Sequence, residues 1–153
     1  MIRGTLESAS RCMPRFAKAR GNNPAAVLGL RYERHVEKAL RQSVKGTIEH
    51  NPWFSFTDRS GLHFCYPDFV LTTDDGILVI EVKYTYTPAA IDQLKKLYLP
   101  VVKKIYDQET YGLILCKNLT PDVLRTVDYL SDAFVMPGAI PTLQWLDRGR
   151  IPW

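Results

Sequence analysis

The segment from His63 to Tyr86, HFCYPDFVLTTDDGILVIEVKYTY, places the strongest constraint on the fold of this chain. Two runs rich in Val, Ile, Tyr and Phe flank an Asp-Asp-Gly sequence, and an Asp-Gly pair between such runs is a strong signal for a β-hairpin. We therefore predict two antiparallel strands that are joined by a two-residue turn at Asp75-Gly76.

Three charged residues, Asp68, Glu81 and Lys83, lie within these predicted strands, where a charge is costly unless it is paired or bound to a metal ion. Glu81 and Lys83 are two residues apart, so their side chains point to the same face of the strand. The predicted turn places Asp68 opposite Lys83, which brings all three charges to one face. A slip of one residue would send Asp68 to the other face.

Two carboxylates and an ammonium group on one face can bind a hard divalent cation, and the ammonium can orient a water or stabilise an oxyanion. The same three residues also fit a structural salt bridge between Lys83 and either carboxylate. On the charge pattern alone, the salt bridge is the simpler interpretation.

The length of 153 residues fits one domain, and the sequence has no apolar run that could span a membrane. The opening segment lacks the apolar core of a secretory signal. Cys12, Cys65 and Cys116 are not spaced like metal ligands and are predicted to be reduced thiols, with the last two buried in strands. We therefore expect an intracellular, cytoplasmic protein with no membrane partner.

The net charge of +4 resides in the first residues of the chain. Residues 1–23 carry five basic residues and one acidic residue, while residues 24–153 carry fifteen of each. We predict a basic, flexible arm at 1–23 and a single domain at 24–153. The arm could bind phosphate backbones, act as an organelle-targeting peptide, or be a solvated tail.

A first helix is predicted from Ala25 to Gln42, with Asn23 as its N-cap. Glu33 borders the apolar stripe of this helix, whereas Glu37 is expected to form a surface pair with Arg41. The cations Arg31, Arg34 and Lys38 lie on much of the opposite side. Beyond the helix we predict a strand at Thr47–His50 and a turn at 58–61. Between them lies an aromatic cluster, Trp53, Phe54 and Phe56, which is expected to pack in the core or cover the sheet, with stacking on bases as the alternative. His50 and His63 are expected to be ordinary polar neighbours.

A second helix is predicted to start at Pro88, with Gln93 beside its apolar stripe and Lys95 and Lys96 facing outward. Pro100 should kink or divide this helix. A buried strand at 111–117, a third helix at 120–131 and a strand at 142–146 follow. The alternation of helices and strands predicts an α/β sandwich with a mixed sheet.

Pro67-Asp68, followed after a short turn by Glu81-Val82-Lys83, resembles the signature of the PD-(D/E)xK nuclease superfamily. The helix with Glu33 resembles the first motif of that superfamily. Gln93, in QLKKLY, is similar to a glutamine in its RecB-type and lambda-exonuclease-like branches. Those branches usually place a tyrosine four residues later, whereas Tyr98 follows at five, which leaves the branch open. The resemblance covers residues 25–131.

The resemblance implies a restriction-endonuclease-like α-β-β-β-α-β core, with a mixed central sheet flanked by helices. It also implies hydrolysis of DNA phosphodiester bonds with one or two Mg²⁺ or Mn²⁺ ions and a 5′-phosphate product. In this resemblance, Asp68, Glu81 and the Val82 carbonyl would bind the metal, and Glu33 would bind a second ion directly or through water. Lys83 would orient or help deprotonate the attacking water and stabilise charge on the phosphate. Gln93 would hold a metal-bound water, the lysine or the nucleic-acid backbone.

The implied partner is DNA, with RNA left open, and either a homo-oligomer or a larger recombination complex. Its phosphates would contact exposed cations on the two helices: Arg31, Arg34, Lys38, Lys95 and Lys96. Exonuclease, restriction-type endonuclease and junction-resolving endonuclease stay open. Two further alternatives are a non-catalytic binding or assembly module that keeps the fold and an accessory domain that acts only in a larger complex.

Overall fold

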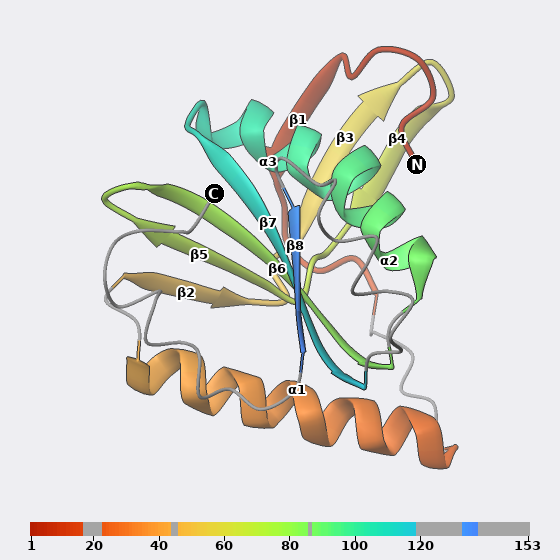
Figure 1. Ribbon diagram of the computed structural model, residues 1–153. Helices are drawn as coiled ribbons and strands as arrows, with labels where there is room; N and C mark the ends of the chain where they lie inside the picture. Colours follow the sequence, from red (N-terminus) through yellow and green to blue (C-terminus); the bar gives the residue numbers. More distant parts are fainter. Residues whose placement is uncertain (17–22, 44–45, 86, 119–132, 138–153) are drawn as a thin grey trace.

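The computed structural model describes residues 1–16, 23–43, 46–85, 87–118 and 133–137 (Figure 1). The elements in chain order are β1 (Ser8–Arg11), α1 (Pro24–Ser43), β2 (Thr47–His50), β3 (Phe54–Asp58), β4 (Gly61–Cys65), β5 (Phe69–Thr73), β6 (Gly76–Thr85), α2 (Pro88–Gln93), the π-helix η1 (Leu94–Tyr98), α3 (Leu99–Tyr106), β7 (Thr110–Asn118) and β8 (Ala133–Pro137). The helix predicted at 120–131 and the strand predicted at 142–146 lie outside the described residues.

The larger sheet has the strand order β2-β5-β6-β7-β8. Its strands β2, β5 and β6 are antiparallel neighbours, while β6, β7 and β8 run parallel. The sheet is therefore mixed, as predicted. Taken along the chain, α1, β2, β5, β6, the α2–α3 segment and β7 follow one another as α-β-β-β-α-β. The predicted restriction-endonuclease-like fold class is confirmed, with the β3–β4 hairpin inserted between the first and second core strands.

Strand β6 lies inside the sheet, and both of its faces are covered by helices. Leu78 and Ile80 pack into the core on the α1 side, while Ile77 and Val79 pack into the core on the side of α2 and α3. Figure 1 shows the two helical layers on opposite sides of the sheet. Burial on both faces explains why this strand reads as a continuous apolar run.

Helix α1 begins where the sequence predicts. The Asn23 Oδ1 atom accepts a hydrogen bond from the Ala26 N–H at 2.8 Å, which confirms the N-cap, and Pro24 is the first helical residue. Tyr32, Val36 and Leu40 form the buried stripe of the helix against the sheet. This packing holds α1 across the strands that carry the charged residues.

The turn between β5 and β6 lies one residue earlier than predicted, which shifts the pairing of the two strands by two residues. Thr73 pairs with Gly76 and Phe69 with Ile80, so the two turn residues are Asp74 and Asp75. The prediction of Asp75-Gly76 was wrong because Gly76, at a φ of +136°, is the first strand residue rather than the last turn residue. A shift of two keeps every side chain on its predicted face.

The first predicted strand of the hairpin is not continuous. Residues 61–65 form β4 in a second, three-stranded sheet of order β1-β3-β4, and residues 69–73 form β5 in the larger sheet. The chain changes sheets at Tyr66-Pro67-Asp68, where Pro67 has no N–H to donate to a strand partner. The predicted hairpin arm was therefore too long, and Asp68 sits just before the point where β5 begins.

Part of the basic arm belongs to the second sheet. Strand β1, Ser8–Arg11, pairs antiparallel with β3, and Ser8 lies opposite Thr57. The sequence analysis did not predict this strand, because its residues SASR have neither alternating hydrophobicity nor β-branched side chains. The aromatic residues Phe54 and Phe56 of β3 are buried in the core, as predicted.

Asp58 fastens the arm to the turn between β3 and β4. Its carboxylate accepts hydrogen bonds from the Arg3 N–H at 2.6 Å and from the Ser60 N–H at 2.8 Å and hydroxyl at 2.7 Å. These hydrogen bonds hold the pKa of Asp58 well below its ordinary value of 3.8, and the bond from Arg3 has the largest effect.

Because the pKa is lowered in the folded state, the carboxylate stabilises the fold above pH 3.8, and this contribution is lost as the pH falls below that value. We expect Asp58→Asn to have a lower urea unfolding midpoint than wild type at about pH 7. The difference between the two midpoints should shrink toward about pH 3. Asp75→Asn, in an exposed turn, is the control. A gap that does not change with pH would contradict this role.

The second helical segment runs from Pro88 to Tyr106 with a π-helical turn in its middle. The Leu99 N–H bonds to the Leu94 carbonyl, five residues back. Pro100, which lacks an N–H, directly follows this turn, in agreement with the predicted irregularity. Because a π turn aligns residues five apart, Gln93 and Tyr98 meet, and the Gln93 Nε2 atom donates to the Tyr98 hydroxyl at 2.6 Å.

Cys65 and Cys116 are buried free thiols, as predicted, and Cys12 is a partly buried one. Burial raises the pKa of Cys65 to about 12 and that of Cys116 to about 11, which keeps both thiols protonated. Among the described residues, none of the helices has the length and apolar character needed to cross a membrane.

Candidate active site

The candidate site lies where the larger sheet opens. Strand β6 pairs with β5 only up to Ile80, but it continues to Thr85 with β7 on its other side. Beyond Ile80, the Val82 N–H donates to the Asp68 Oδ2 atom at 2.8 Å. The Asp68 side chain thus takes the place of the strand partner that β6 lacks at this point, and the carboxylate is fixed at the edge of the sheet.

Asp68, Glu81 and Lys83 meet at this opening, on the face predicted from the sequence. Both carboxylates are buried, with 7% of Asp68 and 3% of Glu81 exposed. The Lys83 ammonium donates a hydrogen bond to the Glu81 Oε1 atom. Continuing the observed register places Asp68 opposite Glu81 rather than opposite Lys83, which corrects the predicted pairing while keeping the cluster.

The pKa values of neighbouring groups reflect the charge of this pair of carboxylates. Burial lowers the pKa of Lys83, but the Glu81 charge, its hydrogen bond and the Asp68 charge outweigh burial, so the pKa is raised overall. Burial and then the charges of Glu81 and Asp68 raise the pKa of the Tyr98 hydroxyl. Lys83 is therefore an ammonium and Tyr98 a neutral hydroxyl near neutral pH.

Gln93 is joined to the cluster through Tyr98. The Tyr98 hydroxyl receives the hydrogen bond from Gln93 and itself donates to the Tyr66 carbonyl at 3.5 Å, directly before Pro67-Asp68. The contact between Gln93 and Tyr98 forms despite the unusual five-residue spacing because the π turn aligns the two residues. The predicted contact of Gln93 with a water, the lysine or a phosphate stays a prediction.

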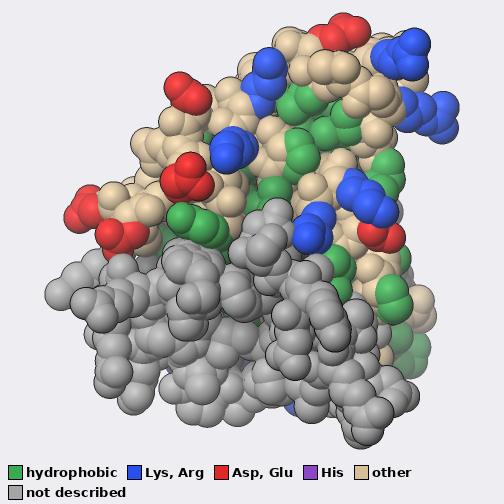
Figure 2. Space-filling model, turned by 45° about the horizontal axis from the view of Figure 1, so that its top comes forward, with side chains coloured by type: hydrophobic (Ala, Val, Ile, Leu, Met, Phe, Trp, Pro, Cys, Tyr) green, Lys and Arg blue, Asp and Glu red, His purple; other side chains and the backbone are tan. Residues whose placement is uncertain are grey.

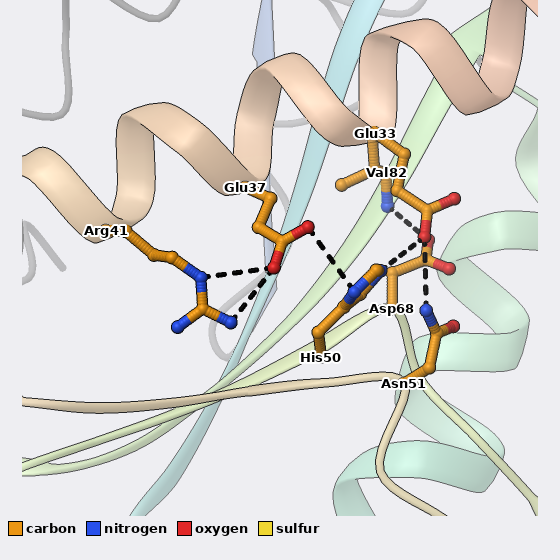
Figure 3. A network of polar contacts seen from close by, with 7 residues as sticks. All are labelled: Glu33, Glu37, Arg41, His50, Asn51, Asp68 and Val82. Atoms are coloured by element: carbon orange, nitrogen blue, oxygen red, sulfur yellow. Dashed lines mark hydrogen bonds and ion pairs between the residues drawn. The ribbon is translucent and has the colours of Figure 1, made fainter.

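Glu33 reaches the site from helix α1 (Figure 3). Its Oε1 atom lies 2.8 Å from the His50 Nε2 atom and 3.2 Å from the Asn51 Nδ2 atom. Glu33, Asp68 and Lys83 line one cavity of about 520 Å³. The structure thus brings the predicted helical acid to the same cavity as two members of the charged cluster.

Asn51 links α1 to Asp68, a role that the sequence analysis missed. Its side chain donates to Glu33, while its backbone N–H donates to the Asp68 carbonyl at 2.8 Å. Its φ of +50° is in the left-handed region, which asparagine tolerates better than most residues. The Asn-Pro pair after the predicted strand was a turn signal, but its partner could be found only from the pairing of His50 with Phe69.

We expect Asn51→Ala to be less stable than Asn51→Gly. Both variants lose the bond to Glu33, but alanine also pays about 1–2 kcal/mol to adopt a left-handed conformation that glycine adopts freely. Urea unfolding of the two variants and wild type measures the difference. Equal midpoints for the two variants would mean that the backbone relaxes at this position.

His50 is more than the isolated polar neighbour that was predicted. It contacts Glu33 through one ring nitrogen and Glu37 through the other at 3.4 Å, and its ring stacks on Phe69 with centroids 4.8 Å apart. Glu37 also forms the predicted pair with Arg41, whose Nη2 atom lies at 2.9 Å. The network in Figure 3 therefore joins Glu33 and Glu37 on α1 to His50 at the end of β2.

The five predicted phosphate-binding cations lie on two elements. Arg31, Arg34 and Lys38 are exposed on α1, and Arg34 also lines the cavity. Lys95 and Lys96 lie on η1, where Lys96 pairs with Asp92 at 2.6 Å. On the face seen in Figure 2, Lys and Arg side chains are interspersed with Asp and Glu rather than gathered into one patch. Contact of these cations with nucleic acid stays a prediction.

The oxygen ligands of the site suit magnesium. Among the described residues, no group of three or more His, Cys, Asp and Glu side chains is placed to hold a metal ion. Asp68 and Glu81 form a buried pair of carboxylates instead. Magnesium is usually bound by one or two carboxylates, with waters and substrate phosphates as further ligands, whereas zinc takes a fuller set of protein ligands. The residues present therefore fit Mg²⁺ or Mn²⁺.

No protein-family model and no curated protein matches the chain. Among solved structures, protein VC1899 from Vibrio cholerae is similar with a TM-score of 0.50 and 11% identity, over 81% of this chain and 31% of that one. A repair endonuclease from Pyrococcus abyssi has a TM-score of 0.45 and 17% identity, over 80% and 50% of the two chains. EndoMS, solved with double-stranded DNA, has a TM-score of 0.48 and 14% identity, over 84% and 50%.

This chain spans between about a third and a half of the length of these three proteins. At such identities, the likeness to VC1899 extends to the fold alone. A similar architecture is thus found in VC1899, while the chemistry of the site follows from the residues of this chain.

Proposed function

We propose that this chain is a metal-dependent deoxyribonuclease of the PD-(D/E)xK superfamily. It would hydrolyse DNA phosphodiester bonds to leave a 5′-phosphate, in recombination, repair or end processing. The observation that carries this proposal is the meeting of Asp68, Glu81 and Lys83 at the open end of β6. A structural salt bridge accounts for Lys83 and Glu81, but it leaves a second buried carboxylate beside them.

Asp68 and Glu81 would hold Mg²⁺ or Mn²⁺ together with the Val82 carbonyl. The N–H and C=O of one strand residue point to the same side of the strand. Because the Val82 N–H points to Asp68, its carbonyl oxygen faces the same edge. A divalent ion bound there would supply Lewis-acid stabilisation of the phosphate and a more acidic water.

Lys83 would act as an ammonium. Its raised pKa keeps it protonated, so it would orient the attacking water by a hydrogen bond and stabilise the charge that develops on the phosphate, rather than remove a proton. Gln93 would position Tyr98 and, through it, the backbone before Asp68. Glu33, which His50 and Asn51 hold at the cavity, would bind a second ion.

The nucleic acid would approach over the cations of the two helices. Arg34 on α1 lines the cavity that also holds Asp68 and Lys83. The other proposed phosphate contacts are Arg31, Lys38, Lys95 and Lys96. The proposed substrate is DNA, and the chain would work as a homo-oligomer or within a larger recombination complex.

A cleavage panel tests the proposal. The substrates are linear duplex, single-stranded, circular and four-way-junction DNA, together with RNA, each with Mg²⁺, with Mn²⁺ and with excess EDTA. We expect cleavage of at least one DNA substrate with either metal, none in EDTA, and products that a ligase can rejoin through their 5′-phosphates. Cleavage that persists in EDTA, or a chain that neither cleaves nor binds either metal, would overturn the proposal.

A further inference from the structure

The cavity that holds Asp68, Glu33 and Lys83 has an aromatic wall. The rings of Trp53 and Tyr66 both line it, and they stack on each other with centroids 4.6 Å apart and an angle of 26° between their planes. The rings of Phe16 and Trp53 form a T-shaped pair with centroids 4.5 Å apart, and Phe16 is 54% exposed. Of the two uses predicted for Trp53, packing and stacking on bases, the second fits its position in the same cavity as the charged groups.

The wall that α1 contributes includes small residues. Ala25, Ala26 and Gly29 line the cavity one to two helical turns before Glu33. A Cβ atom at Gly29 would meet no heavy atom within 4 Å, so the glycine borders open space. Glycine inside a helix is unfavourable relative to alanine, and no close contact requires it here. The small residues therefore widen the space in front of the aromatic pair.

The aromatic pair is tied to the carboxylate. Tyr66 is two residues before Asp68, and two residues span at most about 7 Å. The hydrogen bond from Tyr98 to the Tyr66 carbonyl joins this backbone to η1. Arg34 and Lys83 line the same cavity and supply positive charge beside the rings. A nucleotide whose phosphate lay at Asp68 could thus have its base against the rings.

We propose that the cavity binds one unpaired nucleobase against the Trp53–Tyr66 pair, next to the phosphate at which the chain cuts. This inference rests on the proposed nuclease function and names its substrate class: single-stranded DNA or a junction between single and double strand. Aromatic stacking accepts any base because every base has a π face. A base inside an intact duplex is already stacked and paired, so it would first have to be extruded.

Binding in EDTA tests this without cleavage. Fluorescence anisotropy compares a labelled oligothymidylate with an abasic strand of equal length and charge, for the full chain. We expect the strand with bases to bind on the order of tenfold more tightly. Tyr66→Leu and Gly29→Phe, which remove the stacking surface and fill the space, should reduce this ratio to about one. Gly29→Ala and Tyr106→Leu, the latter outside the cavity, are controls that should keep it.

Equal affinity of the wild type for the two strands would overturn the base site, and so would a full preference in both Tyr66→Leu and Gly29→Phe. Thermal unfolding checks each variant, and Gly29→Phe tests the site if Tyr66→Leu does not fold. A chain that prefers bases but neither cleaves DNA nor binds either metal would overturn the proposed activity and leave the base site standing. Cleavage of DNA without any preference for strands with bases would overturn the base site and leave the proposed activity standing.

Discussion

Lys83→Ala should reduce metal-dependent cleavage by about 10²–10³-fold or more, while DNA affinity in EDTA changes by less than about threefold. Lys83 is the ammonium within the cluster and donates to Glu81, so its removal takes away the group that would stabilise charge on the phosphate. The loss of one phosphate contact among several would have little effect on binding. Single-turnover cleavage and anisotropy on the same substrate measure the two effects.

The matched control for this variant is Lys104→Ala. Lys104 is an exposed lysine on α3 and lies outside the candidate site, so its loss should leave the cleavage rate within about threefold of wild type. Lys83→Ala also leaves the buried Glu81 carboxylate without its cation, so a lower thermal midpoint is expected without metal. Wild-type cleavage rates in Lys83→Ala would refute the assignment of this lysine.

Asp68→Asn should abolish stabilisation by metal as well as cleavage. A ligand that binds only the folded state at about 100 times its Kd stabilises that state by about 2.7 kcal/mol. We expect Mn²⁺ to raise the thermal midpoint of the wild type but not that of Asp68→Asn. Asparagine keeps an oxygen that can accept the Val82 N–H, so the variant should fold. Without metal it should be at least as stable as wild type, because one buried carboxylate is gone.

Asp75→Asn is the control for this experiment. Asp75 is exposed in the turn between β5 and β6 and lies outside the candidate site, so the variant should respond to Mn²⁺ as the wild type does. An equal Mn²⁺ shift in Asp68→Asn would mean that the ion binds elsewhere. Because this readout is thermal stability, it tests the metal ligand even if the natural substrate is not in the cleavage panel.

The convergence of the charged residues could be predicted because it depends on strand parity. Asp68, Glu81 and Lys83 share a face for any even shift in strand pairing, so the observed shift of two residues left the prediction intact. The mixed sheet could be predicted equally well, because a long buried strand after a helix indicates a parallel crossover. These features depend on the periodicity of side chains along strands and helices, which small errors in the boundaries of those elements do not change.

Features that depend on pairing between distant segments of the chain could not be predicted from the sequence. Strand β1 has no hydrophobic pattern, and only its pairing with β3 defines it as a strand. The two strands are far apart in the chain, since Ser10 and Ser55, whose hydroxyl groups are in contact, are separated by 45 residues. The position of Asn51 between Glu33 and Asp68 requires β2 to lie beside β5. The break at Pro67 could have been noticed, because proline seldom lies inside a central strand. Its significance, a change of sheet, becomes visible only in three dimensions.

The π turn at Leu94–Tyr98 also affects how this chain can be compared with others. A regular α-helix would align Gln93 with the residue four positions on, and the π turn accommodates one more residue without moving either end of the contact. Consider a protein in which a tyrosine follows a glutamine at four residues. A gap-free alignment of this helix with such a protein would match either the glutamine or the tyrosine, but not both. Placing a single-residue gap between positions 94 and 98 aligns both at once, although alignment methods usually penalise gaps inside helices.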